Sequence, residues 1–304
     1  MASFPSGEIA VVSGACACAT PVTNKKTMTA MAFMPRIIVV FSPCSQCLCG
    51  AKLLSVTFLL AVLQLISNSP AVEARQGVAV DATHFYAIDS RAIGKYDKRT
   101  GSSVANWQAP KDSGVIHLDG GIVVDGKLYC AHSNFPALPM RSSVEIWETD
   151  TLKHVGTHDF GVRWGSLTWL DRRDGFWWAT FANYDQIING KRYGGKENTL
   201  LVKLDDNWQE LKTWAYPASL LARFGEMSNS GGSWGPDGRL YLTGHDAPEV
   251  YAVKLPENGG VLDFLETLPA PIAGQGIAWD RSTPGILYGI VREKRQVTAS
   301  RFSP

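Results

Sequence analysis

Short apolar runs alternate with polar turns from about residue 75 to the end of the chain, and the same unit recurs. Each unit opens at a glycine, continues through an apolar strand to an Asp turn, and returns in a strand that starts with an aromatic pair or Leu-Tyr. The next two segments alternate apolar and polar residues, which is the pattern of half-buried strands. The opening glycines are 44, 44, 67 and 44 residues apart and are Gly77, Gly121, Gly165, Gly232 and Gly276.

A period of about 40–50 residues with four strands per unit is typical of β-propeller blades. The repeat therefore predicts an all-β fold, a single β-propeller domain over residues 75–304 with about five blades of four antiparallel strands. The longer third unit has insertions at 185–198 and 216–230, and the second insertion is expected to contain a short helix. The chain ends just after the third strand of the fifth unit. We therefore expect a last blade that is incomplete, or closed by residues 70–76 at the N-terminal end of the domain.

Residues 1–74 form an N-terminal extension with the features of a targeting segment. The apolar stretch 53–66 is shorter than the about 20 residues of a membrane-spanning helix, and it suits the hydrophobic region of a signal peptide. Val72-Glu73-Ala74 fits a small-residue cleavage site. We expect an exported protein, periplasmic or extracellular, which would be membrane-anchored only if this segment were retained. Five of the six cysteines lie in the first fifty residues, so the domain keeps one thiol, Cys130, and no disulfide is expected.

The charge of the chain argues against a nucleic-acid partner. The net charge is +1, and the repeat region lacks the concentrated Lys/Arg surface that such a partner requires. With 45% hydrophobic residues among 304, the chain can bury a sizeable core. We expect a monomer whose partner is a small molecule.

The two sets of loops in a four-stranded blade lie on opposite faces of a propeller, and here their residue types differ. The first-to-second and third-to-fourth turns consist of Gly, Asp, Lys and Pro, which is ordinary turn chemistry. The blade links and the second-to-third loops carry His, Asn, Arg, Gln and Trp. Because functional residues concentrate on loops displayed by a rigid scaffold, we expect a ligand site at the channel mouth on that face. The expected ligand-binding residues are Gln76, Asp119, Asn134, Arg163, Trp164, Asn183, Tyr184, Asp185, Asn229, Gln275 and Arg292.

Histidines and carboxylates at these strand ends suggest acid–base chemistry. A histidine can act as a general base near neutral pH, and a neighbouring carboxylate can orient its ring. His245 has Asp246 beside it in the sequence, and His132 is a second candidate base that Asp119 could orient. Glu226 is a further carboxylate on the same face. The candidate catalytic residues are therefore His245, Asp246, His132 and Glu226.

The same face offers groups for anions and for metal ions. Arg163 and Arg292 could hold a substrate carboxylate, because a planar guanidinium donates two parallel hydrogen bonds. An oxygen-rich set suits a hard cation such as Ca²⁺, and two histidines with a carboxylate suit Zn²⁺. Relative geometry is not contained in the sequence, so the cofactor stays open, with Ca²⁺ and Zn²⁺ as alternatives. The oxygen-rich set is Glu226, Asn134, Asn183 and Asp246, and the histidines are His132 and His245.

The segments QGVAVD…FYAID…IGKYDKRTG and GPDGRLYLTGHDAPEVYAVKLP resemble β-propellers of the glutamine cyclotransferase type and of the related quinoprotein amine dehydrogenase β-chain type. The resemblance extends over about residues 75–304, and exported bacterial proteins of this general kind are described as cycloisomerases. Because the shared motifs are mostly blade-building residues, the resemblance implies the architecture and leaves the activity open. A cyclotransferase activity would need an acid–base carboxylate, for which Glu226 and Asp246 are the candidates here.

Two functions are compatible with these features. The first is an exported propeller that binds a small polar or acidic ligand at one channel mouth, with a cyclase, lactonase or isomerase activity through His, Asp and Glu side chains. The alternative is a non-catalytic scaffold that binds a protein, peptide or glycan. Exposure of Trp164 and Tyr184 at the rim would favour the scaffold. The enzyme would be favoured by one pocket formed by His132, Arg163, Asn183, His245 and Asp246.

Overall fold

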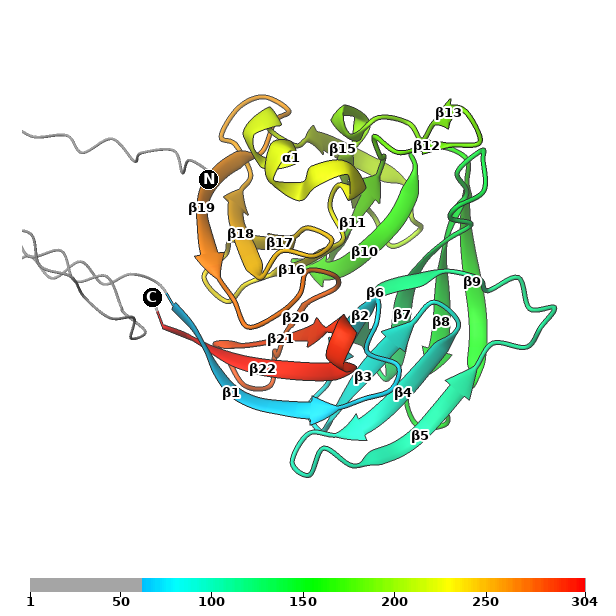
Figure 1. Cartoon of the computed structure of the whole chain (residues 1–304), viewed down its shortest axis with the longest axis vertical. Coiled ribbons are helices and arrows are strands. Elements are labelled where there is room, and N and C mark those ends of the chain that lie inside the picture. Colours follow the sequence, from blue (N-terminus) through cyan, green and yellow to red (C-terminus); the bar gives the residue numbers. More distant parts are fainter. Residues whose placement is uncertain (1–61, 304) are drawn as a thin grey trace, which may run out of the picture. The chain divides into compact units, whose positions relative to one another are not determined.

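The computed structural model describes residues 62–303. Five four-stranded antiparallel sheets surround a central axis as the blades of a β-propeller (Figure 1). The predicted fold class, with five blades of four strands, is thereby confirmed. No helix within residues 62–303 is both long and apolar enough to span a membrane.

The first four blades follow the chain in order, each from its innermost to its outermost strand. The first blade comprises β2 (Gly77–Val80), β3 (His84–Asp89), β4 (Ala92–Asp97) and β5 (Ser103–Gln108). The second comprises β6 (Leu118–Val124), β7 (Lys127–Ser133), β8 (Ser142–Glu148) and β9 (His154–Gly161). The third comprises β10 (Ser166–Arg173), β11 (Phe176–Ala182), β14 (Leu200–Leu204) and β15 (Glu210–Ala215). The fourth comprises β16 (Gly231–Trp234), β17 (Leu240–Thr243), β18 (Glu249–Lys254) and β19 (Asp263–Pro269).

The insertions of the third unit form a small hairpin and short helices. The insertion at 185–198 forms the hairpin β12 (Ile187–Ile188) and β13 (Lys191–Arg192), followed by η1 (Lys196–Asn198). The insertion at 216–230 contains α1 (Ala218–Phe224) and η2 (Gly225–Met227), so the predicted short helix is confirmed. Three apolar side chains of α1 are buried in the core between the third and fourth blades, and they are Leu220, Leu221 and Phe224.

The fifth blade is complete, because its outermost strand comes from the other end of the domain. It comprises β20 (Ala278–Trp279), β21 (Ile286–Val291), β22 (Gln296–Ser303) and β1 (Val62–Pro70), with η3 (Arg292–Lys294) between β21 and β22. β1 pairs antiparallel with β22, from Val62 opposite Ser303 to Pro70 opposite Gln296, and the two strands lie side by side in Figure 1. Closure by the N-terminal end is thus confirmed, but the strand is 62–70 rather than 70–76.

The chain between β1 and β2 also belongs to the fold. Ala71 and Ala74 are buried against the fifth and first blades, and Glu73 accepts a hydrogen bond of 2.6 Å from the Tyr96 hydroxyl. The folded unit therefore includes residues 62–74, which precede the boundary predicted at residue 75. Of the stretch predicted as a signal-peptide hydrophobic region, residues 62–66 lie in β1, and residues 53–61 lie outside the described residues. Cleavage after Ala74 would remove the outermost strand of the fifth blade.

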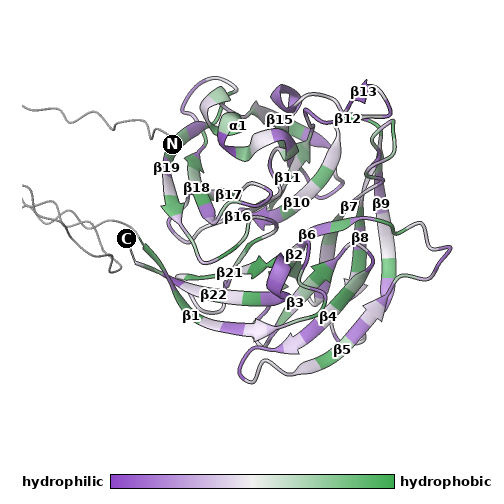
Figure 2. Cartoon of the chain, in the orientation of Figure 1, coloured by the Kyte–Doolittle hydropathy of each residue, from purple (hydrophilic) through white to green (hydrophobic). Residues whose placement is uncertain are grey.

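The core consists of apolar clusters between successive blades, because each strand presents alternate side chains to its two neighbouring blades. Trp177 and Trp178 are adjacent in β11 and show this alternation. Trp177 packs between the second and third blades, and Trp178 packs between the third and fourth. Apolar residues are accordingly spread along the strands of every blade (Figure 2). Apolar packing between neighbouring sheets, rather than one central core, holds the blades together.

The central channel is closed partway along its length. A Cβ at Gly276 would lie 2.8 Å from Cα of Gly77 and 3.0 Å from Cα of Gly120, so the chain entering β20 touches the first residues of β2 and β6 there. A Cβ at Gly232 would lie 2.3 Å from the indole of Trp169, which is 1% exposed. Only residues without side chains permit this approach. The two mouths of the propeller are therefore separate places for a ligand.

Candidate functional site

The face formed by the blade links and the second-to-third loops contains a cavity of about 670 Å³. We call it the arginine cavity. Its lining comes from the link before β2, the loop after β17, the link before β20 and the turn between β21 and β22, so the fourth, fifth and first blades meet there. The lining residues are Arg75, His245, Asp246, Pro248, Ile272, Ala273, Arg292, Glu293 and Arg295.

The arginine cavity contains the predicted pair His245 and Asp246 together with Arg292. His245 Nδ1 lies 2.6 Å from Asp246 Oδ2, and His245 Nε2 lies 3.0 Å from Arg292 Nη1. A guanidinium can only donate hydrogen bonds, so His245 Nε2 is the acceptor and Nδ1 carries the proton that Asp246 accepts. The imidazole in this arrangement is neutral. It links the carboxylate to the guanidinium and holds Arg292 at the cavity wall.

Gln275 holds the main chain at His245 in place through two hydrogen bonds. The Gln275 side-chain amide donates to the His245 carbonyl at 2.8 Å, and the Gln275 backbone N–H donates to the Gly244 carbonyl at 2.9 Å. Gln275 is 1% exposed, so its side chain supports the loop after β17 and does not face a ligand. The segment from Leu240 to Asp246 therefore has a rigid base and a polar tip.

Two further arginines complete the cavity. Arg295 is held by Asp89 at 3.2 Å and by the Val72 carbonyl. The Arg75 side chain is 46% exposed, and its closest acidic group is Asp89, with Arg75 Nε 4.0 Å from Oδ1. Arg75 thus has guanidinium N–H groups available for a ligand. Three arginines and two carboxylates, Asp246 and Glu293, line the cavity, and Asp89 lies next to Arg75 and Arg295.

A second polar group, His117 and Asp119, lies at the start of β6. Asp119 was a predicted candidate, whereas His117 was not. Asp119 is 5% exposed, and no hydrogen bond to its carboxylate is found within residues 62–303. His117 Nε2 lies 3.6 Å from Asp119 Oδ2. Burial raises the pKa of Asp119 well above its ordinary value. Burial, followed by the neighbouring His132, lowers the pKa of His117 to about 4.

Several predicted site residues are part of the scaffold instead. Asn229 is fully buried, accepts a hydrogen bond of 2.6 Å from Trp169 Nε1, and donates to two backbone carbonyls. Asn183 donates to the Trp164 and Asn198 carbonyls, each at 3.0 Å. Asn134 bridges the loop that follows β7 by contacting Pro139 and Arg141. These amides bind the backbone of this chain.

His132, a candidate base, is likewise engaged within the protein. Its Nε2 accepts the backbone N–H of Ile116 at 3.1 Å, and its Nδ1 lies 2.8 Å from Ser143 Oγ. Both ring nitrogens are therefore occupied, and the side chain is buried between the first and second blades. Gln76 donates to Ser90 Oγ at 2.9 Å, which ties the link before β2 to the loop after β3.

The remaining predicted residues lie on the third blade, outside the lining of the arginine cavity. Arg163 pairs with Glu210 at 2.6 Å and stacks on Trp164, which packs against Phe181. Asp185 forms ion pairs with Arg192 and Lys196, at 2.8 and 3.3 Å. Tyr184 is 5% exposed, and Glu226 is exposed in η2 with no side-chain hydrogen bond found in the described part of the chain.

Neither predicted metal set is assembled. Within residues 62–303, no group of three or more His, Cys, Asp or Glu side chains lies close enough together to hold a metal ion. In the oxygen-rich set, the amides of Asn134 and Asn183 are committed to the backbone, and only Asp246 lines the arginine cavity. In the histidine set, His132 is buried and His245 is bonded to Arg292. The groups that the structure does bring together are the guanidinium groups of Arg75, Arg292 and Arg295, which suit an anion.

No protein-family model matches the sequence, and a search of curated proteins gave no match. Among solved structures, the chain is similar to luciferin-regenerating enzyme, with 10% identity, a TM-score of 0.47, and 80% of this chain and 95% of that chain covered. It is similar to the PQQ-bound aldose sugar dehydrogenase of Streptomyces coelicolor (14% identity, TM-score 0.44, coverage 75% and 78%). It is also similar to streptogramin B lyase (9% identity, TM-score 0.43, coverage 80% and 98%). At these identities the likeness extends to the fold alone.

Proposed function

We propose that this propeller binds a small molecule with a carboxylate group in the arginine cavity. The observation that carries the proposal is the Arg292 guanidinium, which His245 and Asp246 orient at the wall of a cavity that Arg75 and Arg295 also line. A guanidinium with a fixed direction loses little freedom when a ligand binds, which favours affinity. Pro248, Ile272 and Ala273 provide an apolar wall for the rest of the ligand.

The available guanidinium groups of the cavity favour an anionic ligand. Asp89 engages Arg295, and His245 links Asp246 to Arg292, whereas Arg75 has the least engaged guanidinium of the three. A ligand carboxylate could accept hydrogen bonds from Arg75 and Arg292. A ligand ammonium would instead have to compete with Arg292 for Asp246. The volume of about 670 Å³ is within the usual range of small-molecule sites.

A catalytic activity of the cyclase, lactonase or isomerase kind would depend on Asp246. This carboxylate is 74% exposed in its side chain and lies in the cavity beside His245, so it can accept a proton from a ligand that the arginines hold. His132 and Glu226 do not line the cavity and have no part in this proposal. Export of the protein also remains a proposal, and it would have to leave β1 in place.

The scaffold alternative has less support. A partner surface was expected to expose Trp164 and Tyr184, but Tyr184 is 5% exposed and Trp164 packs against Phe160 and Phe181. The pocket expected for the enzyme is not assembled either, since only two of its five residues line the arginine cavity, namely His245 and Asp246. Ligand binding is therefore the function that the geometry supports best.

The proposal is tested by a thermal-shift screen with acetate, succinate, glutarate and benzoate, and with matched amines. A ligand that binds the folded state raises the unfolding midpoint, and the rise grows with the logarithm of the ligand concentration above Kd. We expect at least one carboxylate to raise the midpoint and the amine of the same size to do so less. Arg292→Gln should weaken carboxylate binding by about 10- to 100-fold, because hydrogen bonds to charged groups contribute about 1.5–3 kcal/mol.

Arg163→Gln is the matched control, since Arg163 lies on the same face but pairs with Glu210 outside the cavity. It should leave the affinity for the carboxylate unchanged. Equal losses in the Arg163 and Arg292 variants would show that the arginines act through overall charge, and the proposed site would be wrong.

A further inference from the structure

The opposite mouth of the propeller contains a second cavity, of about 350 Å³, which we call the axial well. Residues from the innermost strands of all five blades line it, including Val80, Ile122, Leu170, Ser233 and Ala278. Because the glycine contacts and Trp169 close the channel partway along, the well opens only on the face of the first-to-second turns. That face was expected to carry turn chemistry alone.

A buried carboxylate forms part of the wall of the axial well. Asp171 is 1% exposed, and its Oδ2 accepts hydrogen bonds from the Ser233 hydroxyl at 3.1 Å and from the Trp234 backbone N–H at 2.8 Å. Its Oδ1 accepts the backbone N–H of Arg172 at 2.5 Å and contacts the guanidinium of Arg281. The carboxylate is therefore fixed in place by neutral donors, independently of its cationic partner.

Arg281, in contrast, reaches this carboxylate from the solvent side. Its side chain is 47% exposed, against 2% for Asp171, and the ion pair with Asp171 is the one salt bridge it forms within the described residues. An exposed arginine has a large rotamer freedom, so swinging away from Asp171 costs it little. A buried carboxylate, however, needs a cation or a donor nearby. Arg281 thus occupies a position that another cation could take.

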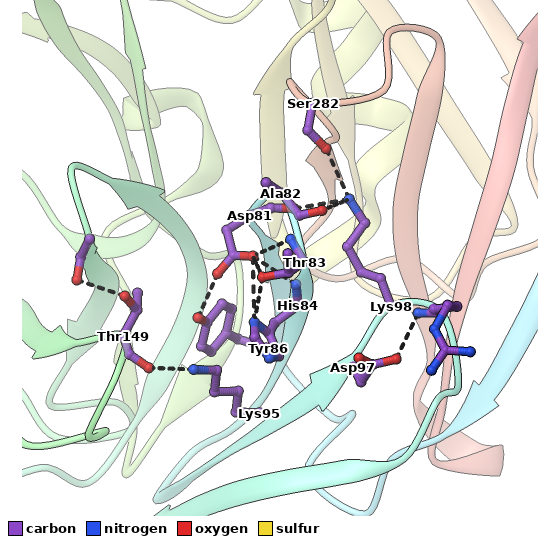
Figure 3. Close-up of polar contacts among 12 residues, drawn as sticks. Asp81, Ala82, Thr83, His84, Tyr86, Lys95, Asp97, Lys98, Thr149 and Ser282 are labelled. Atoms are coloured by element: carbon purple, nitrogen blue, oxygen red, sulfur yellow. Dashed lines mark hydrogen bonds and ion pairs between the residues drawn. The ribbon is translucent and has the colours of Figure 1, made fainter.

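The other charged groups at this mouth are already committed. Asp81 accepts the Tyr86 hydroxyl at 2.7 Å and the backbone N–H groups of Thr83 and His84, each at 2.7 Å (Figure 3). Lys98 contacts the Asp81 carbonyl, and its ammonium pairs with Asp280 at 2.5 Å. Two aspartates against one arginine give the lining of the well a net charge of −1. This balance favours a cation.

We propose that the axial well binds a small organic cation, a primary amine or guanidinium on a compact apolar body, whose charged group replaces the Arg281 guanidinium at Asp171. The apolar part would lie against Val80, Ile122 and Leu170. This site is separate from the arginine cavity, because the closed channel lies between the two mouths. The proposal therefore goes beyond the function proposed above and does not depend on it.

The test is isothermal titration of the full chain with phenethylamine in an amine-free buffer, with 3-phenylpropionate as the anionic counterpart. Arg281→Ala removes the internal competitor, so phenethylamine should bind about 3- to 10-fold more tightly than to the unmodified chain. Asp171→Asn removes the charge and keeps an oxygen acceptor for Trp234, so binding should weaken at least about 10-fold. Arg99→Ala is the matched control, since Arg99 is exposed on the neighbouring turn and does not line the well.

Val80→Phe narrows the well without changing a charge, and it should weaken phenethylamine binding to both the parent and the Arg281→Ala chain. This variant tests the site even if Asp171→Asn fails to fold. The proposal is overturned if Arg281→Ala leaves phenethylamine binding unchanged or weakens it. It is also overturned if Arg281→Ala abolishes the binding of 3-phenylpropionate, because the well would then take an anion. Carboxylate binding that depends on Arg292 alone concerns the arginine cavity and would not bear on this test.

Discussion

The closure of the fifth blade by β1 predicts a specific difference between two leucines of the same strand. Leu63 is 5% exposed and packs in the core between the fourth and fifth blades, whereas Leu65 is 43% exposed. Removing a buried leucine side chain costs about 2–5 kcal/mol, which combines the lost transfer free energy with the cavity left behind. Leu63→Ala in the full chain should therefore lower the free energy of unfolding by about 2–4 kcal/mol. Leu65→Ala should lower it by less than about 1 kcal/mol.

Equilibrium unfolding in urea, followed by tryptophan fluorescence, measures both variants against the parent chain. The two substitutions are chemically identical and two residues apart in the same strand, so any effect on β propensity or expression should be shared. If residues 53–66 were instead the hydrophobic region of a signal peptide that is removed, neither substitution would change the stability of the mature protein. Equal midpoints for the two variants would therefore refute the closure by β1.

Two further predictions concern the residues beneath the ligand face. Asn229→Ala leaves Trp169 Nε1 without its acceptor and removes one donor from the Gly231 and Thr243 carbonyls, so the free energy of unfolding should fall by about 2–3 kcal/mol. A loss below about 1 kcal/mol in urea unfolding would contradict its role as a scaffold residue. The pKa of His117 is about 4 in the fold and about 6.5 when unfolded, so the unfolded state binds the extra proton between these values. Stability should therefore rise with pH across that window, by up to about 3 kcal/mol. His117→Gln should lack this part of the pH dependence, and an unchanged slope would show that His117 is not buried as described.

The blades could be predicted from the sequence because their determinants are local. The recurring glycines, Asp turns and alternating strands each act within a few residues, and the spacing of Gly77, Gly121 and Gly165 sets the repeat. The closing strand could not be predicted in the same way. An apolar run such as 53–66 suits a signal peptide and a strand equally well, and the choice depends on the free edge of β22, more than 200 residues away.

The candidate site was predicted in part for a similar reason. His245 and Asp246 are neighbours in the sequence, and the repeat placed Arg292 at the equivalent strand end. Asn183 and Asn229 stand at similar strand ends, but an amide there can satisfy a backbone carbonyl as readily as a ligand. Only the three-dimensional contacts decide between these roles. A signal was present for Asn229, which precedes a glycine pair where the backbone approaches the axis closely.

The axial well was missed because its key residue looks ordinary in the repeat. An aspartate follows the first strand in all five units, and four of them could be accounted for by turn chemistry. Asp171 is buried like Asp280, and it differs because its carboxylate accepts hydrogen bonds from Ser233 and from the Trp234 backbone N–H of the fourth blade. That difference arises from the packing of the third blade against the fourth, which no local pattern records.

The binding of a carboxylate in the arginine cavity is tested most directly by a crystal structure with 4-bromobenzoate, whose bromine can be located by anomalous scattering. The account predicts the carboxylate within hydrogen-bonding distance of Arg292 and Arg75, with the bromophenyl ring against Ile272 and Pro248. Bromine density at the axial well beside Arg281, with the arginine cavity free of the compound, would contradict it.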